Sequence, residues 1–403
     1  MAPFKPSRHQ IFLGRLHTIT LCWAVFIAGW NDGTLGPLLR TIQKVYNLSY
    51  VIVSLLFVFQ SIGAITGALL NITLTPRLGF GKVQPPSTSL HSYLVGYSLQ
   101  AAAPPFPVFV LSCAFNGIGV SILDAQANGY VASLSQNSEA RMGYVQAAYG
   151  AGVFAAPLVS TQFAQLRHWS FHYLVSLGIT LSNMLCLYLV FRCKSQDENL
   201  ARLGQTAVNK GNSEHSHMRQ ILSNKAVHLL TLFLFVNVGV GVAISGWIVT
   251  FMVDIRGGGP SAGYIAAGFA GGLTIGRVTL IWVNKKIGET RVIYLYSMIA
   301  VGLELIVWLV PSLVGGAVAV SFVGLVFGPM YPLALNRAAK LFPPWLLTGT
   351  ISWMAAMATV GGATVPFVTG AISTKAGIKS LEPVIVSMTV AMLILWALVP
   401  NHI

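Results

Sequence analysis

Twelve mostly apolar runs, each close to the length of a membrane-crossing helix, follow one another along this chain of 403 residues. A helix needs about 20 such residues to cross the hydrocarbon of a bilayer. Only 8% of the residues are charged, whereas a soluble protein carries about 25%. We therefore predict an all-α integral membrane protein. Its spans are expected at residues 16–38, 51–70, 83–103, 106–130, 144–163, 173–191, 227–251, 262–283, 292–310, 313–335, 348–372 and 383–400.

The basic residues predict the orientation of these spans. The formal net charge is +14, which in a soluble protein would indicate a nucleic-acid partner; in a membrane protein, Lys and Arg collect in cytoplasmic loops instead. With both termini placed in the cytoplasm, seventeen of the 24 basic residues fall in inner segments, six in outer loops, and Arg277 within a span. We expect both termini inside, no nucleic-acid partner, and the plasma membrane rather than an internal one.

A polar segment between the sixth and seventh runs divides the chain into two halves. At an offset of 209 residues three glycines and a proline recur, with Gly67, Gly119, Gly152 and Pro157 falling on Gly276, Gly328, Gly361 and Pro366. Parallel repeats of this kind are expected of two bundles that move about a site at the membrane midplane. The predicted domains are a cytoplasmic N-terminal segment 1–15, a six-helix bundle 16–192, a cytoplasmic linker 193–225 and a second six-helix bundle 226–403.

An acid inside an apolar run constrains the fourth span. Asp124 lies near the middle of that run, and an acidic side chain at the centre of a membrane helix costs about 2.5–3.5 kcal/mol. Residues four apart share a helix face, so Asn116, Asp124 and Asn128 belong to one mostly polar stripe. This stripe is predicted to face protein or a water-filled cavity, not lipid.

Two loops resemble the cytoplasmic signature of the major facilitator superfamily. They are residues 67–82 and their copy at 276–291, although the usual acidic residue of the signature is replaced by a neutral one in both. The resemblance implies twelve transmembrane helices in two pseudo-symmetric six-helix bundles. It also implies a gating role for these cytoplasmic loops, with Arg77, Gly79, Lys82, Lys286, Gly288 and Arg291 as the candidate residues.

Residues 30–37 and 116–130 resemble, more narrowly, the fungal members of the fucose permease-like branch of that superfamily. The branch resemblance implies proton-coupled sugar uptake with one acid on the first helix and one on the fourth. Asp32 and Asp124 are the matching residues. One departure lies at 84–93, where two prolines and several hydroxyl residues make a poor opening for a membrane helix; the third span is expected to start late, or this segment is damaged relative to working relatives.

The candidate site combines acids with amide and aromatic side chains. Asp32 and Asp124 are the predicted proton-coupling residues, and Glu304 is expected to pair structurally, with Arg277 as a candidate partner. The predicted solute-binding residues are Asn31, Asn128, Gln146, Tyr149, Asn237, Trp247, Tyr331 and Trp353.

No enzymatic signature accompanies these residues. The sequence contains no nucleophile elbow, P-loop or metal-ligand cluster, so we expect no enzyme activity, no cofactor and no metal. The expected partners are a small solute, a proton and the lipid bilayer, and the chain is expected to act as a monomer. Two alternatives stay open: a proton antiporter for a drug or amphipathic solute, favoured by the Gly-rich and Pro-containing fifth span, and a non-transporting membrane sensor or scaffold, favoured by the irregular third span.

Overall fold

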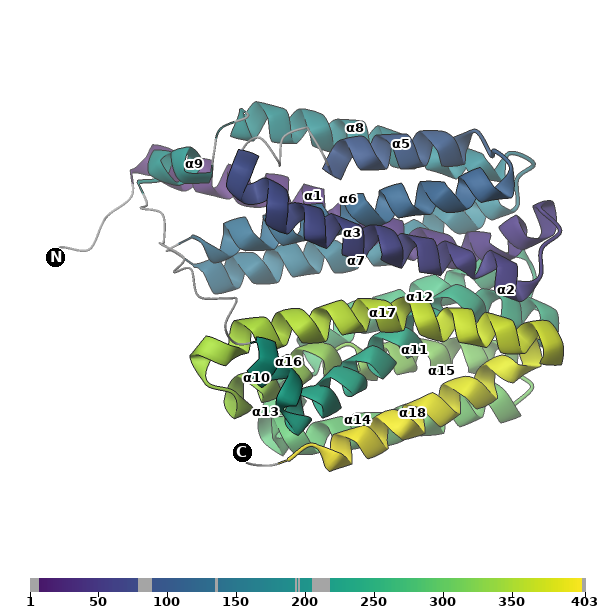
Figure 1. Cartoon of the computed structure of the whole chain (residues 1–403). Coiled ribbons are helices and arrows are strands. Elements are labelled where there is room, and N and C mark those ends of the chain that lie inside the picture. Colours follow the sequence, from purple (N-terminus) through teal and green to yellow (C-terminus); the bar gives the residue numbers. More distant parts are fainter. Residues whose placement is uncertain are drawn as a thin grey trace. The chain divides into compact units, whose positions relative to one another are not determined.

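A computed structural model describes residues 7–78, 89–134, 137–192, 194, 196–204 and 218–400, and every regular element within them is a helix (Figure 1). The helices of the first half are α1 (Arg8–Val45), α2 (Tyr50–Val53), α3 (Leu55–Leu78), α5 (Ser89–Ala101), α6 (Phe106–Ala132), α7 (Ser138–Ala164) and α8 (His172–Phe191). Those of the second half are α11 (Lys225–Arg256), α12 (Tyr264–Thr279), α13 (Ile281–Ile287), α14 (Glu289–Leu309), α15 (Leu313–Phe327), α16 (Met330–Leu341), α17 (Pro344–Ala376) and α18 (Leu381–Leu398). Short helices α9 (Gln196–Arg202) and α10 (Met218–Ser223) lie between the halves in the sequence.

The predicted all-α, twelve-span architecture is confirmed. Nine of the described helical segments are long and apolar enough to cross a membrane, and α12 with α13, bent by 53°, makes a tenth. Helix α7 has the required length at 27 residues but carries Glu139 and Arg141 near its start. Helix α5 is described from Ser89 over 13 residues, so the second half of the irregular segment predicted at 84–93 is helical and its first half, 84–88, lies outside the described residues. The described helices thus follow the predicted order of spans.

The chain forms two compact units whose boundary falls inside helices. Unit 1 comprises Met1–Asp32, Ile62–Ala156 and His168–Gly211, and unit 2 comprises Gly33–Ser61, Pro157–Arg167 and Asn212–Ile403. The ends of α1 and α7, together with α2, therefore belong to the same compact unit as the second half of the sequence. The bundle boundaries predicted at 16–192 and 226–403 stay a prediction.

In unit 1, α5 packs against α6 and α8 (Figure 1). Helix α1 is tied to α6 and α8 by polar contacts: His17 Nδ1 lies 2.7 Å from Tyr130 Oη, and Trp30 Nε1 donates to Ser176 Oγ at 2.9 Å. Every residue in these two contacts is buried or nearly so. Hydrogen-bonding groups inside a membrane helix bundle need such internal partners because lipid offers none.

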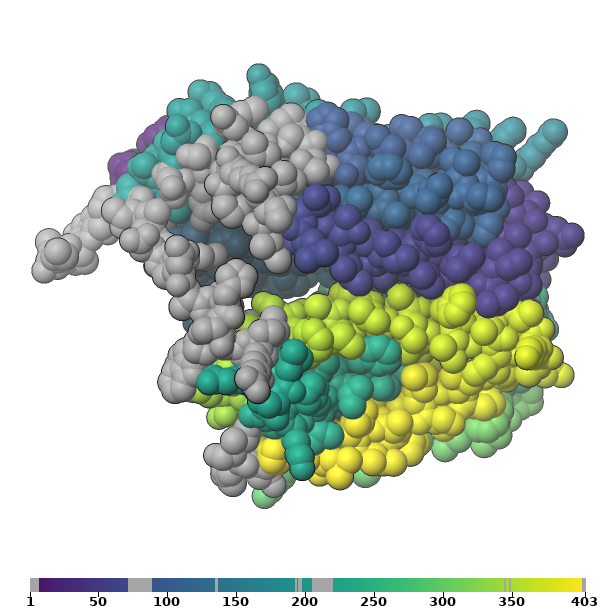
Figure 2. All heavy atoms as spheres, viewed as in Figure 1, coloured from purple at the N-terminus to yellow at the C-terminus, as the bar shows by residue number. Residues whose placement is uncertain are grey.

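In unit 2, α11 is the central helix and packs on α17 and α18. Figure 2 shows its atoms between those of α17 and α18 on the visible face. Helix α12 packs on α15, and α14 packs on both α15 and α18. The contact between α12 and α15 is close because Gly276 has no side chain: a Cβ there would lie 1.9 Å from the carbonyl oxygen of Leu325.

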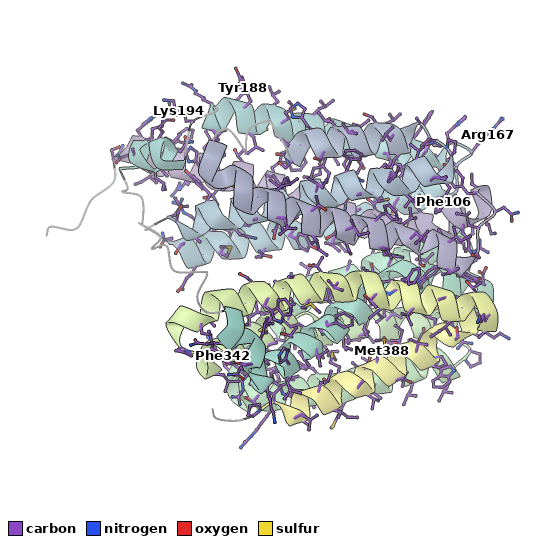
Figure 3. All side chains as sticks on the ribbon, viewed as in Figure 1. Phe106, Arg167, Tyr188, Lys194, Phe342 and Met388 are labelled. Carbon is purple, nitrogen blue, oxygen red and sulfur yellow. The ribbon has the colours of Figure 1, made fainter. Side chains whose placement is uncertain are left out.

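The outward faces of the helices are apolar. Tyr188 of α8 is 54% exposed and points away from its unit (Figure 3). Large exposed apolar side chains also occur on α12, α13 and α15, at Val278, Trp282 and Val314. A soluble protein rarely leaves so much continuous apolar surface uncovered, whereas a bilayer covers it. This pattern agrees with a multi-pass membrane protein.

Candidate functional site

Asp32 lies at the centre of a hydrogen-bonded network between α1, α5 and α7. Tyr149 Oη donates to Asp32 Oδ2 at 2.7 Å, and Asn31 Nδ2 donates to Asp32 Oδ1 at 3.3 Å. Tyr97 Oη of α5 donates in turn to Asn31 Oδ1 at 3.1 Å. Asn31 is buried, whereas Asp32 and Tyr149 are half-buried. The structure therefore brings three of the predicted site residues together around one carboxyl group.

Two glycines allow this network to form. A Cβ on Gly29 of α1 would lie 2.0 Å from the carbonyl oxygen of Tyr149, and one on Gly152 of α7 would lie 2.1 Å from that of Phe26. Small residues let membrane helices approach at backbone distance. The close crossing of α1 and α7 places Tyr149 within reach of Asp32, so helix packing explains Gly152 of the fifth span.

Asp124 belongs to a second row of polar groups, on α6 and α7. Asn128 Nδ2 donates to Asp124 Oδ1 at 2.9 Å, and Gln146 Nε2 donates to Asn128 Oδ1 at 3.2 Å. The third member of the predicted stripe behaves differently: Asn116 is buried and donates to Gln100 Oε1 of α5 at 2.9 Å. The stripe thus serves helix packing at one end and forms a partly exposed polar row at the other.

Two tyrosines of α5, which were not predicted as site residues, lie near Asp32. Tyr93 and Tyr97 are fully buried and stack with ring centroids 5.5 Å apart. Tyr93 interacts electrostatically with Asp32 and with Asp124, and the two acids interact with each other. Tyr93 Oη is buried and has no hydrogen-bond partner among the described residues. The spacing of four between Tyr93 and Tyr97, which puts both on one helix face, was the available signal, but it fell in a span whose start is irregular.

The predicted site residues of the second half lie in neutral surroundings within unit 2. Asn237 is buried, and its Nδ2 lies 3.5 Å from the sulfur atoms of Met330 and Met392. Thioether sulfur is a weak acceptor, so this amide retains donor capacity.

Trp247 is fully buried and donates from Nε1 to the carbonyl oxygen of Pro366 at 3.1 Å. This contact makes Trp247 a packing anchor of α11 and α17. Tyr331 and Trp353 are half-buried, and Trp353 Nε1 has no hydrogen-bond partner among the described residues. The solute-binding roles assigned to these residues stay predictions.

An ion pair joins segments from both sequence halves at the ends of α1, α7 and α11. This region is called the Arg40 end of unit 2. Arg40 Nη2 lies 2.6 Å from Asp254 Oδ1, with the two side chains 25% and 32% exposed. Gln162 of α7 donates to the hydroxyl of Tyr264. Helix α11 ends beside this pair because Gly257 adopts a left-handed conformation, with φ of 67°.

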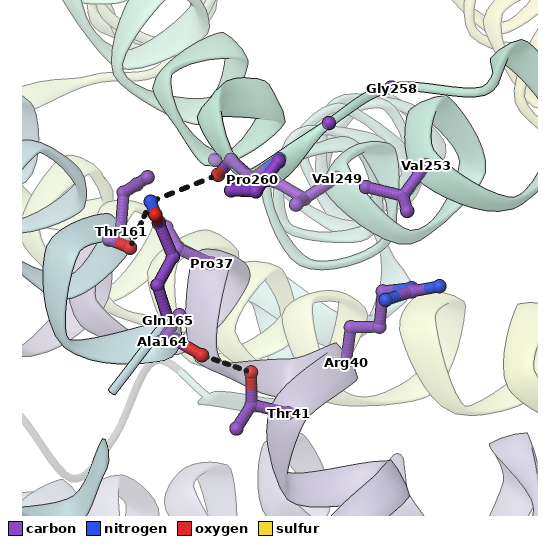
Figure 4. A pocket seen from close by; sticks show the side chains of 12 residues that line it. Pro37, Arg40, Thr41, Thr161, Ala164, Gln165, Val249, Val253, Gly258 and Pro260 are labelled. Atoms are coloured by element: carbon purple, nitrogen blue, oxygen red, sulfur yellow. Dashed lines mark hydrogen bonds between the residues drawn. The ribbon is translucent and has the colours of Figure 1, made fainter. Parts of the chain in front are cut away.

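A pocket of about 360 Å³ lies at the Arg40 end (Figure 4). Arg40, Thr161 and Gln165 contribute to its lining. Gln165 Nε2 donates to the carbonyl oxygens of Thr161 and Pro260, at 3.2 and 3.3 Å, which ties the end of α7 to the loop after α11. Residues 40 and 254 both lie just outside the spans predicted at 16–38 and 227–251, and no pairing between them was predicted.

Of the predicted gating residues, Gly79, Lys82 and the side chain of Arg77 lie outside the described residues. Lys286 lies over the ring of Trp282, with its ammonium 4.9 Å from the ring centroid. Gly288 separates α13 from α14 with φ of 94°, a conformation that favours glycine, and Arg291 is exposed on α14. Their gating role stays a prediction.

One expected pairing is wrong. Glu304 does not pair with Arg277; its carboxyl group shares a hydrogen bond with Glu382 of α18. The Nε of Arg277 has no hydrogen-bond partner among the described residues. The reason is geometric, because α14, which carries Glu304, packs on α18 and α15.

Known proteins resemble this chain over most of its length. The sequence model described as Major Facilitator Superfamily matches residues 21–344. The chain is 26% identical to Bypass of stop codon protein 6 of Saccharomyces cerevisiae, covering 96% of this chain and 82% of that protein. It is 18% identical to the glucose/mannose transporter GlcP of Bacillus subtilis, covering 84% and 83%.

Solved structures share the fold at low sequence identity. A D-xylose-proton symporter superposes with a TM-score of 0.78 at 14% identity, covering 97% of this chain and 98% of that one. The E. coli fucose:proton symporter superposes with a TM-score of 0.63 at 19% identity, covering 97% and 99%. These structural similarities establish the fold. The identity of the solute depends on the residues of the site.

Proposed function

We propose that this chain, which belongs to the major facilitator superfamily and is a multi-pass membrane transporter, carries a sugar or similar small polar solute together with a proton by alternating access. The proposal is carried by two neighbouring sets of hydrogen bonds. Asp32 accepts hydrogen bonds from Tyr149 and Asn31. Asn128 donates to Asp124 and accepts from Gln146. The solute class is supported by three similar proteins whose names refer to sugars: the D-xylose-proton symporter, the fucose:proton symporter and the glucose/mannose transporter GlcP.

The chemistry of this network suits a solute rich in hydroxyl groups. An ionised carboxylate only accepts hydrogen bonds, whereas a protonated one also donates. Protonation of Asp32 or Asp124 therefore changes which hydrogen bonds a bound hydroxyl can make, and this links proton binding to solute binding. The amides of Asn31, Asn128 and Gln146 supply both donors and acceptors whichever form the acids take.

Alternating access requires the two sequence halves, 16–192 and 226–403 in our proposal, to move about the site. In the second half Asn237, Trp247, Tyr331 and Trp353 are the proposed solute contacts. For the Arg40 end to open, the Arg40–Asp254 ion pair and the contact between Gln162 and Tyr264 must separate.

The test is uptake by purified protein in proteoliposomes with an acidic exterior, using labelled glucose, xylose and fucose. We expect at least one sugar to accumulate against its gradient and a protonophore to abolish the accumulation. Expulsion of a cationic dye driven by the proton gradient, with no sugar uptake, would establish the antiporter alternative. Absence of both fluxes in folded protein would leave the sensor or scaffold alternative.

The orientation and membrane are part of the proposal. The excess of Lys and Arg in segments 1–15 and 193–225 and in the other predicted inner loops supports cytoplasmic termini. We assign the chain to the plasma membrane as a monomer. Epitope tags at each terminus should be reached by antibody only after permeabilisation of intact cells; staining without permeabilisation contradicts this topology.

A further inference from the structure

Two acids outside the candidate site meet inside unit 2. Glu304 lies on α14 and Glu382 lies in the first turn of α18. Each residue is only 1% exposed, and their carboxyl groups share a hydrogen bond. The transport mechanism proposed above uses neither residue, and no basic side chain forms an ion pair with either acid among the described residues.

A hydrogen bond between two carboxyl groups requires a proton. An ionised carboxylate has no hydrogen to donate, and two like charges at this separation repel strongly where the surroundings are poorly polarisable. Glu304 and Glu382 therefore hold at least one proton between them. Glu304 Oε1 and Glu382 Oε2 are buried without a hydrogen-bond partner among the described residues, so the pair has no further donor with which to stabilise a second negative charge.

The surroundings match a pair that has one proton and one negative charge. Arg256 of α11 acts electrostatically on Glu382 while its Nη2 donates to the carbonyl oxygens of Val307 and Trp308, both at 2.8 Å. Glu382 also lies in the first turn of its helix, where the helix dipole favours a negative charge. The single positive charge of Arg256 can offset at most one negative charge on the pair.

Other charged groups on the neighbouring elements are directed elsewhere. Helix α15 contains no titratable residue, and Lys375 and Lys379, on α17 and the short turn before α18, are exposed. Asp254 of α11 is paired with Arg40. The other charged residues of α14, Glu289 and Arg291, lie in its first turn, far along the helix from Glu304. Arg337 and Lys340 of α16 contact that same first turn, at Thr290 and Glu289.

We propose that Glu304 and Glu382 form a proton-binding site that holds one resident proton at neutral pH and thereby stabilises the packing of α14 against α18. This proton is separate from the one that Asp32 and Asp124 are proposed to exchange. Its release at alkaline pH would place two negative charges between buried helices, so the stability of unit 2 should fall as pH rises.

The first test measures the apparent Tm of the purified full chain between about pH 6 and pH 9, a range over which ordinary Asp and Glu residues stay ionised. We expect the Tm of the wild type to fall by on the order of 5 °C more than that of Glu382→Gln. The Gln amide donates to Glu304 without needing a proton, so this variant should lack the part of the pH dependence that comes from the pair. Glu289→Gln, on an exposed ion pair, is the matched control and should follow the wild type. Equal pH sensitivity in wild type and Glu382→Gln would overturn the proposal.

The second test does not depend on the folding of Glu304 or Glu382 variants. An Asp32→Asn, Asp124→Asn double variant retains the Glu304–Glu382 pair but lacks both acids of the candidate site. Its infrared spectrum at neutral pH should retain the C=O stretching band of a protonated carboxyl group, shifted when D2O replaces H2O and lost at alkaline pH. Absence of that band at neutral pH would show that the pair holds no proton.

Discussion

The two halves of the molecule share a backbone contact but differ in their ionisable side chains. Gly152 lies against the carbonyl oxygen of Phe26, and Gly361 lies against that of Phe235; a Cβ on either glycine would come within 2.1 Å. The offset between the two contacts is 209 residues for both partners, as in the sequence repeat. The crossing of α1 with α7 therefore recurs as the crossing of α11 with α17.

The acids do not recur. At the same offset Asp32, Asp124 and Tyr149 correspond to Gly241, Leu333 and Ala358. Conversely, Glu304 and Glu382 correspond to Val95 and Tyr173. The repeat has preserved the places where backbones touch, because a side chain there would force the helices apart. The positions of charge are free to diverge, so each half holds its acids at a different place and, by our proposals, for a different purpose.

The largest effect is expected from removal of the first-half acids. Asp32→Asn and Asp124→Asn should each abolish uphill accumulation of solute in proteoliposomes, because a neutral amide cannot carry the proton. At least one variant should keep solute exchange or binding, since the amide still forms hydrogen bonds. Glu289→Gln, which alters an exposed ion pair with Lys340, should accumulate solute normally. Wild-type accumulation in both Asp variants would remove the coupling hypothesis.

Next come the paired glycines, which test whether the shared contact matters equally in both halves. Gly152→Ala and Gly361→Ala should each lower the free energy of unfolding by about 1–3 kcal/mol, because the added methyl group overpacks a backbone contact. Thermal unfolding of the purified variants measures this. Gly152→Ala should also reduce uptake, since that crossing seats Tyr149 beside Asp32. Gly129→Ala, also within a helix but with no neighbouring atom within 4 Å of an added Cβ, is the control and should not lower Tm, because alanine is the better helix former.

Tyr149→Phe should have a smaller effect, confined to the first half. It removes the phenol that donates to Asp32 at 2.7 Å, and a hydrogen bond to a charged group contributes about 1.5–3 kcal/mol. We expect uptake to fall by roughly tenfold or more with no change of fold. The control is Tyr188→Phe on the exposed face of α8. Unchanged uptake in Tyr149→Phe would exclude this hydrogen bond from the mechanism.

The smallest effect is expected at the Arg40–Asp254 ion pair, because both side chains are partly exposed. Such pairs contribute about 0.2–1 kcal/mol. Arg40→Ala should therefore raise the thiol-labelling rate of a Thr161→Cys reporter in the adjacent pocket only about two- to fivefold. The charge swap Arg40→Asp with Asp254→Arg should restore the original rate. A rate unaffected by both changes would mean that the pair does not hold this end closed.

The sequence allowed the number, order and class of the helices to be predicted, and two of the acids to be selected. Hydropathy is a property of each segment alone, so it can be read without knowing the segment's neighbours. The same holds for the identity of an acid within an apolar run. Asn31, Asp32 and Tyr149 were each selected as site residues, because the resemblance assigned the first acid and polar side chains within apolar runs can be read from the sequence.

The partners of the polar side chains depend on which helix faces which, and periodicity along one helix does not contain that information. Glu304 binds Glu382 and not Arg277 because α14 packs on α18. Asn116 turns to Gln100, and Trp247 to the backbone of Pro366, for the same reason. The crossing of helices that are distant in the chain thus fixes whether a buried polar group stabilises the packing or remains available to a solute.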